Sequence, residues 1–302
     1  MKLLIEIGNT SLKWALLQGE AGLPGPMAAA RHFGALPIDV LASWDQLGGV
    51  ERVLVASVGP DTVLDAVKTA VAAYWQCPLT PIETSAEALG VRVAYAEPER
   101  LGVDRFLALI GAHWLAGRPD LLTGALEQVK PEPELTYKPK PRGGFSSDHV
   151  PAVKPTVSPS PERPLPRHSE TPESGCATLI IDAGTAITFD ALLADGRHRG
   201  GQIMPGISML RESLLRGTRL PPHQTLDQHD PWGIDTGPAI AAASLQAPAA
   251  LAERLRSVLH QETGKIPRLL MTGGDAGRLA PLLDQTVHLQ PDLVLIGLSR
   301  FA

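Results

Sequence analysis

Short apolar runs alternate with amphipathic segments along the chain, a pattern typical of strands followed by helices. Residues 3–7 and 12–16 predict two short strands joined by a tight turn, and residues 52–58 predict another buried strand. Apolar positions at helical spacing predict helices over residues 64–74 and 101–115. Strands that alternate with helices favour the α/β class.

The middle of the chain breaks this pattern. Many of the 28 prolines fall within residues 118–175, with Ser, Lys and Glu between them and few large apolar side chains. Proline does not fit inside a continuous helix or a central strand. We therefore expect a Pro-rich, disordered or polyproline-like insertion at 118–175, between an N-terminal domain at 1–117 and a C-terminal domain at 176–302. A solvated loop is its expected role, and a docking segment for a partner is the alternative.

Regular structure resumes after the insertion, where residues 177–182 predict a strand. Further helices are expected at three places: residues 210–215, 239–257 and 279–283. Pro248 predicts a break or kink in the second of these helices. Two short elements of a second core are expected at residues 268–271 and 293–296.

Composition and charge exclude several classes of protein. With 302 residues, 44% of them hydrophobic, the chain is large enough for two globular domains. The net charge of −5 argues against a nucleic-acid partner, because nucleic-acid binders ordinarily carry a basic excess. Glu6 interrupts the N-terminal apolar run, and no other stretch is long enough to cross a bilayer, so no membrane partner is expected. Two distant cysteines, Cys77 and Cys176, fit a cytoplasmic protein.

The turn between the first two strands carries candidate chemistry. Residues 8–11, Gly-Asn-Thr-Ser, permit a sharp turn and offer hydroxyl and main-chain N–H donors that can hold phosphate oxygens. Glu6 at the end of the first strand can hold magnesium directly or through water, and Lys13 adds positive charge. Alone, such a hairpin tip is usually only a turn.

The second half of the chain repeats this arrangement. Residues 182–190, Asp-Ala-Gly-Thr-Ala-Ile-Thr-Phe-Asp, again predict a strand, a tight turn and a strand. Two such hairpins can face each other across a cleft and hold a triphosphate from both sides, which makes the pair more specific than either copy. Residues 272–275, Thr-Gly-Gly-Asp, follow an apolar strand, and glycines at such a turn let a flat base lie against the backbone.

Together these segments resemble a known family. The two hairpins and the late Gly-Gly are similar to the phosphate-1, phosphate-2 and adenosine motifs of actin-like kinases. Three more segments resemble those of type III pantothenate kinases: Gly-Val-Asp-Arg at 102–105, Gly-Gly-Gln-Ile-Met-Pro-Gly at 200–206 and Asp-Thr-Gly-Pro-Ala-Ile at 235–240. The resemblance implies a two-domain actin-like (ribonuclease H-like) ATPase fold with a cleft between the domains. It also implies ATP-dependent phosphorylation of pantothenate, the first step of coenzyme A biosynthesis.

The resemblance implies roles for particular residues. Asp104 is expected to be the catalytic base that accepts the proton of the pantothenate hydroxyl. The residues expected to bind ATP are Glu6, Ile7, Gly8, Asn9, Thr10, Ser11, Leu12, Lys13, Thr185, Gly273 and Gly274. The residues expected to bind pantothenate are Tyr95, Gly102, Val103, Asp104, Arg105 and Thr236. Within that set, Arg105 would hold the carboxylate with its planar guanidinium group.

The resemblance also implies cations and a partner. Asp182 resembles the residue that binds a monovalent cation, K⁺ or NH₄⁺, and Asp182 is also a candidate ligand of the Mg²⁺ that accompanies ATP. Glu6 is the other candidate for Mg²⁺. Members of the family are homodimers whose pantothenate pocket lies at the interface, so a homodimer is expected.

One departure from the family pattern leaves alternatives open. The family usually has Asp where this chain has Glu6, and the extra methylene moves the carboxylate by about 1.5 Å. Catalytic sites tolerate little displacement of this kind. A nucleotide-binding regulatory accessory protein with little turnover is therefore one alternative, and another actin-like small-molecule kinase is the second. The histidines, His198 among them, show no metal-ligand spacing and are expected to be core or surface residues.

Overall fold

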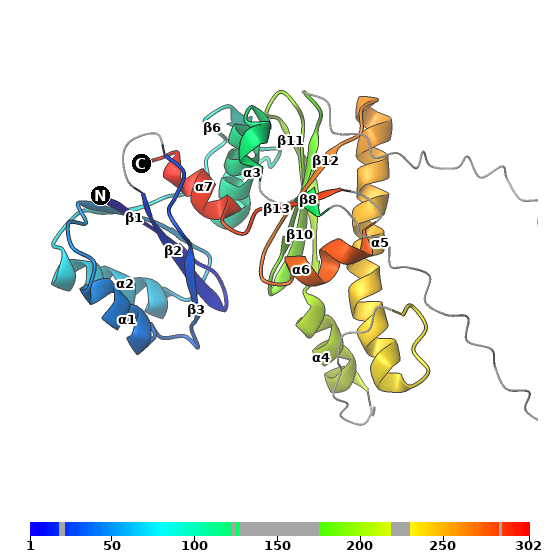
Figure 1. Cartoon of the computed structure of the whole chain (residues 1–302), viewed down its shortest axis with the longest axis horizontal. Helices are drawn as coiled ribbons and strands as arrows, with labels where there is room; N and C mark the ends of the chain where they lie inside the picture. The colour runs from blue at the N-terminus through cyan, green and yellow to red at the C-terminus, as the bar shows by residue number, and fades with distance from the viewer. Residues whose placement is uncertain (18–21, 123–124, 127–174, 219–229, 284–285) are drawn as a thin grey trace, which may run out of the picture.

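The computed structural model describes residues 1–17, 22–122, 125–126, 175–218, 230–283 and 286–302. Two large β-sheets form the framework of the described residues (Figure 1), and a small third sheet joins β6 (Glu87–Ala88) to β7 (Val91–Arg92). The first sheet has five strands: β1 (Lys2–Ile7), β2 (Ser11–Leu17), β3 (Ala28–Arg31), β4 (Arg52–Ser57) and β5 (Leu79–Pro81). The second has six: β8 (Ala125–Leu126), β9 (Thr178–Ala183), β10 (Ala186–Leu192), β11 (His198–Pro205), β12 (Arg268–Thr272) and β13 (Val287–Leu289).

The two sheets share one strand order. The first runs β3-β2-β1-β4-β5, and the second runs β11-β10-β9-β12-β13, with β8 added at its edge. In the first sheet β1, β2 and β3 pair antiparallel, and β4 and β5 continue from β1 in parallel. In the second sheet β9, β10 and β11 pair antiparallel in the same way, β12 and β13 continue from β9 in parallel, and β8 pairs antiparallel with β13. This duplicated order is that of the actin-like fold, so the predicted fold class is confirmed.

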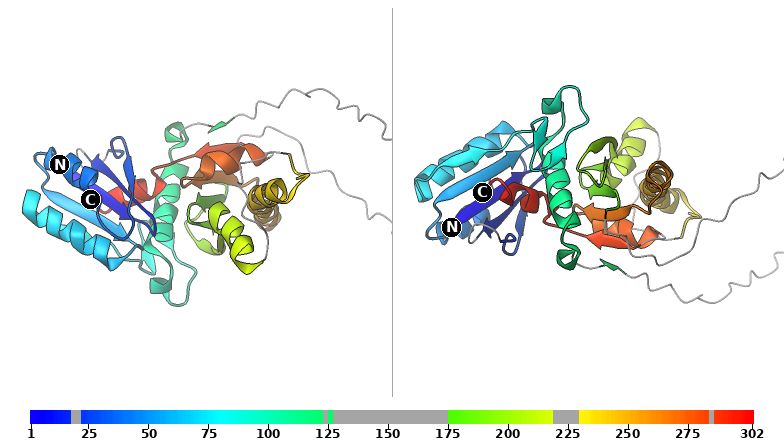
Figure 2. Two further views of the ribbon diagram at one scale, coloured as in Figure 1. Left: turned by 90° about the horizontal axis from the view of Figure 1, so that it is seen from below. Right: turned by 90° about the horizontal axis from the view of Figure 1, so that it is seen from above.

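Helices cover both sheets and fill the layer between them. They are α1 (Ile38–Asp45), α2 (Asp61–Tyr74), α3 (Val103–Ala116), α4 (Ile207–Gly217), α5 (Thr236–Thr263), α6 (Ala276–Leu279) and α7 (Leu293–Ser299). Helices α1 and α2 lie on the outer face of the first sheet, and α5 and α6 lie on the outer face of the second (Figures 1 and 2). Helices α3 and α7 pack together between the two sheets, and we call this the central layer. Within the described ranges no helix is both long and apolar enough to span a bilayer.

Strand alternation directs the acidic residues into the central layer. In β1, Leu3 and Ile5 pack toward α1 and α2, whereas Leu4 packs against α3 and α7. Strand β9 divides its apolar side chains between the two faces of the second sheet in the same way. Because side chains alternate with a period of two, Glu6 in β1 and Asp182 in β9 face the central layer from opposite sides.

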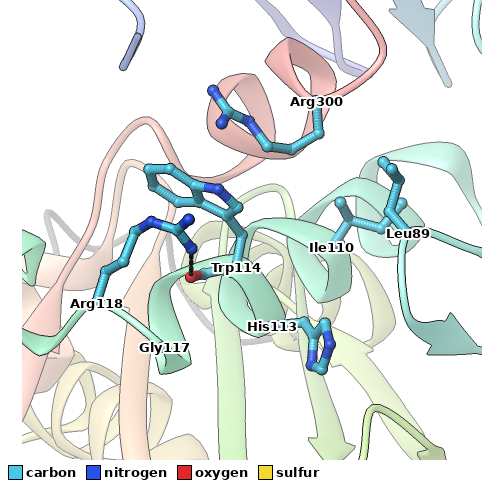
Figure 3. Close-up of a pocket in the computed structure, with 7 residues that line it drawn as sticks. All are labelled: Leu89, Ile110, His113, Trp114, Gly117, Arg118 and Arg300. Atoms are coloured by element: carbon cyan, nitrogen blue, oxygen red, sulfur yellow. Dashed lines mark hydrogen bonds between the residues drawn. The ribbon is translucent and has the colours of Figure 1, made fainter. Parts of the chain in front are cut away.

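A stack of three side chains joins the C-terminal ends of α3 and α7. The guanidinium groups of Arg118 and Arg300 each lie 4.3 Å from the ring centroid of Trp114 (Figure 3). Arg118 donates a hydrogen bond to the main-chain oxygen of Trp114 at 3.1 Å, and Arg300 donates to the carbonyl of Gly22 at 2.7 Å. Cations near helix C-termini interact favourably with the last carbonyl groups, so this stack stabilises the central layer.

The structure corrects two of the predicted elements. Helix α5 is continuous through Pro248, so no break occurs there. Pro248 and Ala249 are buried, and packing against the second sheet outweighs the one main-chain hydrogen bond that proline cannot make. Residues 293–296 belong to α7, which packs in the central layer instead of a separate second core. Most of the predicted insertion, residues 127–174, lies outside the described residues, and the division into domains stays a prediction.

Candidate active site

Two hairpin turns from different sheets meet beside the central layer. The hydroxyl oxygen of Thr10, between β1 and β2, lies 2.8 Å from that of Thr185, between β9 and β10, although 175 positions separate them. Each turn is tight: the Gly8 N–H donates to the Ser11 carbonyl at 2.8 Å, and the Gly184 N–H donates to the Ala186 carbonyl at 3.1 Å. The structure therefore places the two glycine-containing turns face to face, as the sequence predicted.

Three carboxylates and one ammonium group form an electrostatic cluster next to these turns. Glu6 is 7% exposed, and the Lys13 Nζ lies 3.2 and 3.3 Å from its two carboxylate oxygens. Burial raises the pKa of Glu6, an effect that Lys13 opposes and the charge of Asp104 reinforces. Burial would lower the pKa of Lys13, but the carboxylates of Glu6, Asp182 and Asp104 raise it above its usual value. The four residues thus interact electrostatically, because the charges of some members shift the pKa values of others.

Asp182 is the member of the cluster best suited to a cation. Burial raises its pKa to about 7; Lys13 opposes the rise, and the charges of Glu6 and Asp104 add to it. No side-chain hydrogen bond to its carboxylate is found in the described part of the chain. A partly buried carboxylate without a donor favours a bound positive ion.

The donor set fits ions that keep part of their own hydration shell. The residues described include no group of three or more His, Cys, Asp or Glu side chains that could hold a metal ion by themselves. Mg²⁺ is usually held by one or two carboxylates together with water and substrate phosphates. The carboxylates of Glu6 and Asp182 therefore suffice for such an ion, although Lys13 already contacts both oxygens of Glu6.

Asp104 lies in the first turn of α3, where the helix dipole favours a negative charge. Its Oδ1 accepts a hydrogen bond from the main-chain N–H of Arg105 at 2.7 Å. Burial raises the pKa of Asp104, and this N–H group and the Arg105 charge only partly offset the rise. A carboxylate with a raised pKa is a stronger base than an exposed aspartate, as proton abstraction requires.

The guanidinium group of Arg105 is engaged inside the protein. Arg105 is 6% exposed, and its Nε and Nη2 donate to the two carboxylate oxygens of Asp190 at 2.8 and 2.6 Å. Its Nη1 donates to the hydroxyl oxygen of Tyr95 at 3.1 Å. Asp190 therefore accepts from two of the three guanidinium nitrogens. From the sequence, we expected this guanidinium group to bind the carboxylate of pantothenate.

The charges of this pair stabilise each other. Burial would lower the pKa of Arg105, but hydrogen bonds and the charge of Asp190 raise it. Burial would raise the pKa of Asp190, but hydrogen bonds from His198 and Arg105 hold it below its usual value. Both groups are therefore ionised in the neutral pH range, and the pair carries no net charge.

Asp190 and His198 were missed by the sequence analysis as site residues. His198 was expected to be either a core or a surface residue, and it is buried. Its Nε2 lies 2.9 Å from Asp190 Oδ1, and its ring stacks on that of Tyr95. A signal for Asp190 was present in the sequence. It pairs with Ile180, a central-layer residue, and an acidic side chain on a buried strand face requires a partner.

Two glycines allow close approach around the carboxylates. Gly273 has φ +93°, and a β-carbon there would lie 2.6 Å from Asp182 Oδ1. A β-carbon on Gly201 in β11 would lie 2.8 Å from the Nη2 of Arg105. One glycine of each pair, Gly201 and Gly273, thus has a packing role next to the cluster. A β-carbon on Gly200 or Gly274 would face open space.

The other predicted residues next to the cluster contribute mainly main-chain groups. Ile7 and Leu12 are buried in the core beneath α1 and α2, so their side chains do not reach a ligand. The carbonyl of Ile7 already accepts hydrogen bonds from the main-chain N–H groups of Val58 and Gly59 at 2.9 and 3.1 Å. Gly102 is the N-cap residue of α3 and Val103 is its first residue, directly before Asp104.

Thr236 is not brought into the cluster. It is the first residue of α5, and its N–H donates to the Oδ1 of Asp235, the N-cap residue, at 2.7 Å. Among the residues described, no hydrogen bond joins Thr236 to Tyr95, Asp104 or Arg105.

Comparisons with known proteins identify the family of the chain. A family model described as type III pantothenate kinase matches residues 2–123 and 168–258. The type III pantothenate kinase of Nitrosococcus oceani is 32% identical, over 100% of this chain and 94% of its own length. That of Halorhodospira halophila is also 32% identical, over 100% of this chain and 98% of its own.

Two solved structures are also similar to the chain. A putative Baf family transcriptional activator from Campylobacter jejuni has a TM-score of 0.49 at 14% identity, over 99% of this chain and 96% of its own. A glucokinase from an Antarctic psychrotroph has a TM-score of 0.45 at 12% identity, over 99% of this chain and 98% of its own. Both scores are below 0.5, so the fold assignment rests on the strand order of the two sheets.

Proposed function

The chain belongs to the family of type III pantothenate kinases, and from this premise we propose how its residues carry out the reaction. The protein is an ATP-dependent kinase that phosphorylates pantothenate in the first step of coenzyme A biosynthesis. ATP and a divalent metal ion are its cofactors. The roles of individual residues, the monovalent cation, the homodimer and a cytoplasmic location are proposals.

One observation carries the proposed mechanism: the Thr10–Thr185 contact joins two phosphate-type turns directly beside the carboxylate cluster. Phosphoryl transfer depends mostly on positioning and on neutralisation of charge. We assign the two turns to the ATP phosphates, with Lys13 as a fixed positive charge. Mg²⁺, held with the phosphates near Glu6 and Asp182, would neutralise charge on the transferred group.

Asp104 is the proposed general base. It is the carboxylate of the cluster that lies next to the proposed pantothenate residues, and its raised pKa suits proton abstraction. It accepts the proton of the pantothenate hydroxyl as that oxygen attacks the γ-phosphorus of ATP. ADP leaves with the oxygen that bridged the β- and γ-phosphates.

The pantothenate carboxylate would be held by the donors that Asp190 does not bind, on Arg105 and Tyr95. The Nη1 of Arg105 and the hydroxyl group of Tyr95 lie 3.1 Å apart, and both can donate to one carboxylate. Asp190 and His198 fix the Arg105 guanidinium group in place. The main-chain groups of Gly102 and Val103 would complete this side of the pocket.

We propose a homodimer on the basis of a set of exposed apolar side chains. Five such side chains lie on β11, α4 and the segment that leads into α5: Ile203, Met209, Leu214, Trp232 and Ile234. Large exposed apolar surfaces in soluble enzymes commonly mark interfaces. A second copy that covers this surface would bury the residues near Thr236, which by itself makes no contact with the cluster.

Turnover tests the proposed function directly. ADP release should require ATP, Mg²⁺ and pantothenate, and KCl should stimulate it through Asp182. The Asp104→Asn variant should lose at least about two orders of magnitude in kcat, the usual worth of a general base. A wild-type protein that binds ATP tightly yet releases no ADP with pantothenate would instead favour the regulatory nucleotide-binding protein.

The Glu6–Lys13 pair is the observation that favours the second candidate function, a regulatory nucleotide-binding protein. Lys13 contacts both oxygens of the residue that replaces the family's usual aspartate. If turnover is absent, restored activity in Glu6→Asp would identify a kinase that has lost its activity through this substitution. Continued inactivity would support the regulatory protein.

A further inference from the structure

His32 lies buried behind the turn of the first hairpin. It directly follows β3, is 3% exposed, and its Nε2 lies 2.8 Å from the carbonyl oxygen of Gly8. Its main-chain N–H donates to the carbonyl of Thr10 at 3.1 Å. Because a carbonyl oxygen only accepts hydrogen bonds, Nε2 carries the proton and donates it. One residue therefore holds the turn at two of its carbonyl groups.

The bond to Gly8 fixes the direction of a second group. In a planar trans peptide the N–H of Asn9 points away from the Gly8 carbonyl, and the described residues contain no cis peptide bond. Holding that carbonyl on the His32 side therefore turns the Asn9 N–H to the opposite side. No acceptor for this N–H occurs among the described residues. A free N–H held in one direction at a hairpin tip is a donor for a phosphate oxygen.

Packing alone does not explain an imidazole at this position. The Nδ1 of His32 is buried and has no hydrogen-bond partner in the part of the chain described. A buried polar atom without a partner lowers stability, and an apolar side chain of similar size would avoid that loss. The Nε2 bond to Gly8 is therefore the interaction that accounts for histidine.

We propose that His32 is a positioning residue for the nucleotide phosphates. Its imidazole holds the Gly8–Asn9 peptide so that the first hairpin presents its N–H donors to the triphosphate. This inference rests on the proposed role of that hairpin in ATP binding. Neither the sequence motifs nor the comparisons assign a role to His32.

Substitutions at position 32 separate the donor from the packing. His32→Leu fills the space without a donor, whereas the side-chain amide of His32→Gln can still donate to the Gly8 carbonyl. Phe33→Ala is the matched control, because the Phe33 side chain is 92% exposed. Binding of ATP and of adenosine to the full chain would be measured by titration calorimetry for each variant.

The substitution should affect the affinity for ATP and not that for adenosine, because only ATP carries phosphates. We expect His32→Leu to weaken ATP binding roughly tenfold, the upper range for one hydrogen bond, and to leave adenosine binding unchanged. His32→Gln should recover most of the ATP affinity, and Phe33→Ala should match the wild type. Equal losses for ATP and adenosine, or unchanged ATP binding in His32→Leu, would overturn the proposal. If His32→Leu does not fold, His32→Met provides the same comparison.

The same data distinguish this inference from the proposed function. A wild-type protein that does not phosphorylate pantothenate, but shows this pattern of ATP and adenosine affinities, would refute the reaction and support the role of His32. A wild-type protein that binds ATP no more tightly than adenosine would refute both.

Discussion

Replacement of Asp190 by alanine tests the buried network that holds Arg105. The substitution removes the acceptor of three hydrogen bonds, two from Arg105 and one from His198. It leaves a guanidinium group that is 6% exposed without its counter-charge. Removal of one partner from a buried ion pair typically costs about 3–5 kcal/mol of the free energy of unfolding. We expect a loss of that size at pH 7 and much weaker pantothenate binding.

Urea unfolding followed by tryptophan fluorescence measures the change. Asp195→Ala is the matched control, because Asp195 pairs with Arg197 at the surface, where both side chains are more than half exposed. That variant should unfold like the wild type, since surface ion pairs contribute little. The double variant Arg105→Met with Asp190→Ala should lose less stability than Asp190→Ala alone, because no unpaired charge stays buried. Equal stability of Asp190→Ala and Asp195→Ala would refute the reasoning.

Three further predictions concern the cations, the glycines and the interface. Because the pKa of Asp182 is raised to about 7, its contribution to stability falls as the pH rises from about 4 to about 7, so KCl should raise the Tm more at pH 8 than at pH 6. Asp182→Asn should abolish that difference, and a wild type that lacks it would contradict the proposed cation site. A β-carbon at Gly201 would meet the Asp190 carboxylate and the Phe189 carbonyl before it meets Arg105, so Gly201→Ala should displace Asp190 and the Arg105 that it holds. The variant should raise the KM for pantothenate while the KM for ATP stays constant, and equal changes in both would contradict this. Ile234→Glu should convert a dimer into monomers in sedimentation experiments, and an unchanged mass would exclude this surface as the interface.

The local parts of the fold and the site could be predicted from sequence because they depend on short-range rules. Hydrophobic periodicity indicated both hairpins, and the segments Gly8-Asn9-Thr10 and Gly184-Thr185 indicated their turns. The two hairpins were expected to face each other, but the contact between the hydroxyl groups of Thr10 and Thr185 was not predicted, because no periodicity specifies which atoms meet across a long separation. The pairing of Arg105 with Asp190 across 85 positions was missed for the same reason. The sequence motif identifies Arg105, but only the packed structure shows that the Asp190 carboxylate already binds its guanidinium group.

The cross-strand register offers an explanation of how the chain accommodates Glu6. Glu6 and Lys13 are directly opposite each other in the antiparallel pair of β1 and β2. Opposite charges at such positions attract, and the longer glutamate side chain allows both its oxygens to reach the ammonium group. A metal ion held near Glu6 would therefore compete with Lys13 for the same two carboxylate oxygens.

This pairing has a consequence for the charge of the site. The carboxylates of Glu6, Asp104 and Asp182 face one ammonium group, and the Arg105–Asp190 pair adds no net charge. The cluster is thus negative before a triphosphate with further negative charge arrives, and like charges in a poorly solvated site repel strongly. We therefore expect ATP binding to be coupled to cation binding. Lys13 already contacts Glu6, whereas no hydrogen bond to the Asp182 carboxylate is found in the described part of the chain. If Asp182 holds K⁺ as proposed, Asp182→Asn should weaken the dependence on K⁺ more than the dependence on Mg²⁺.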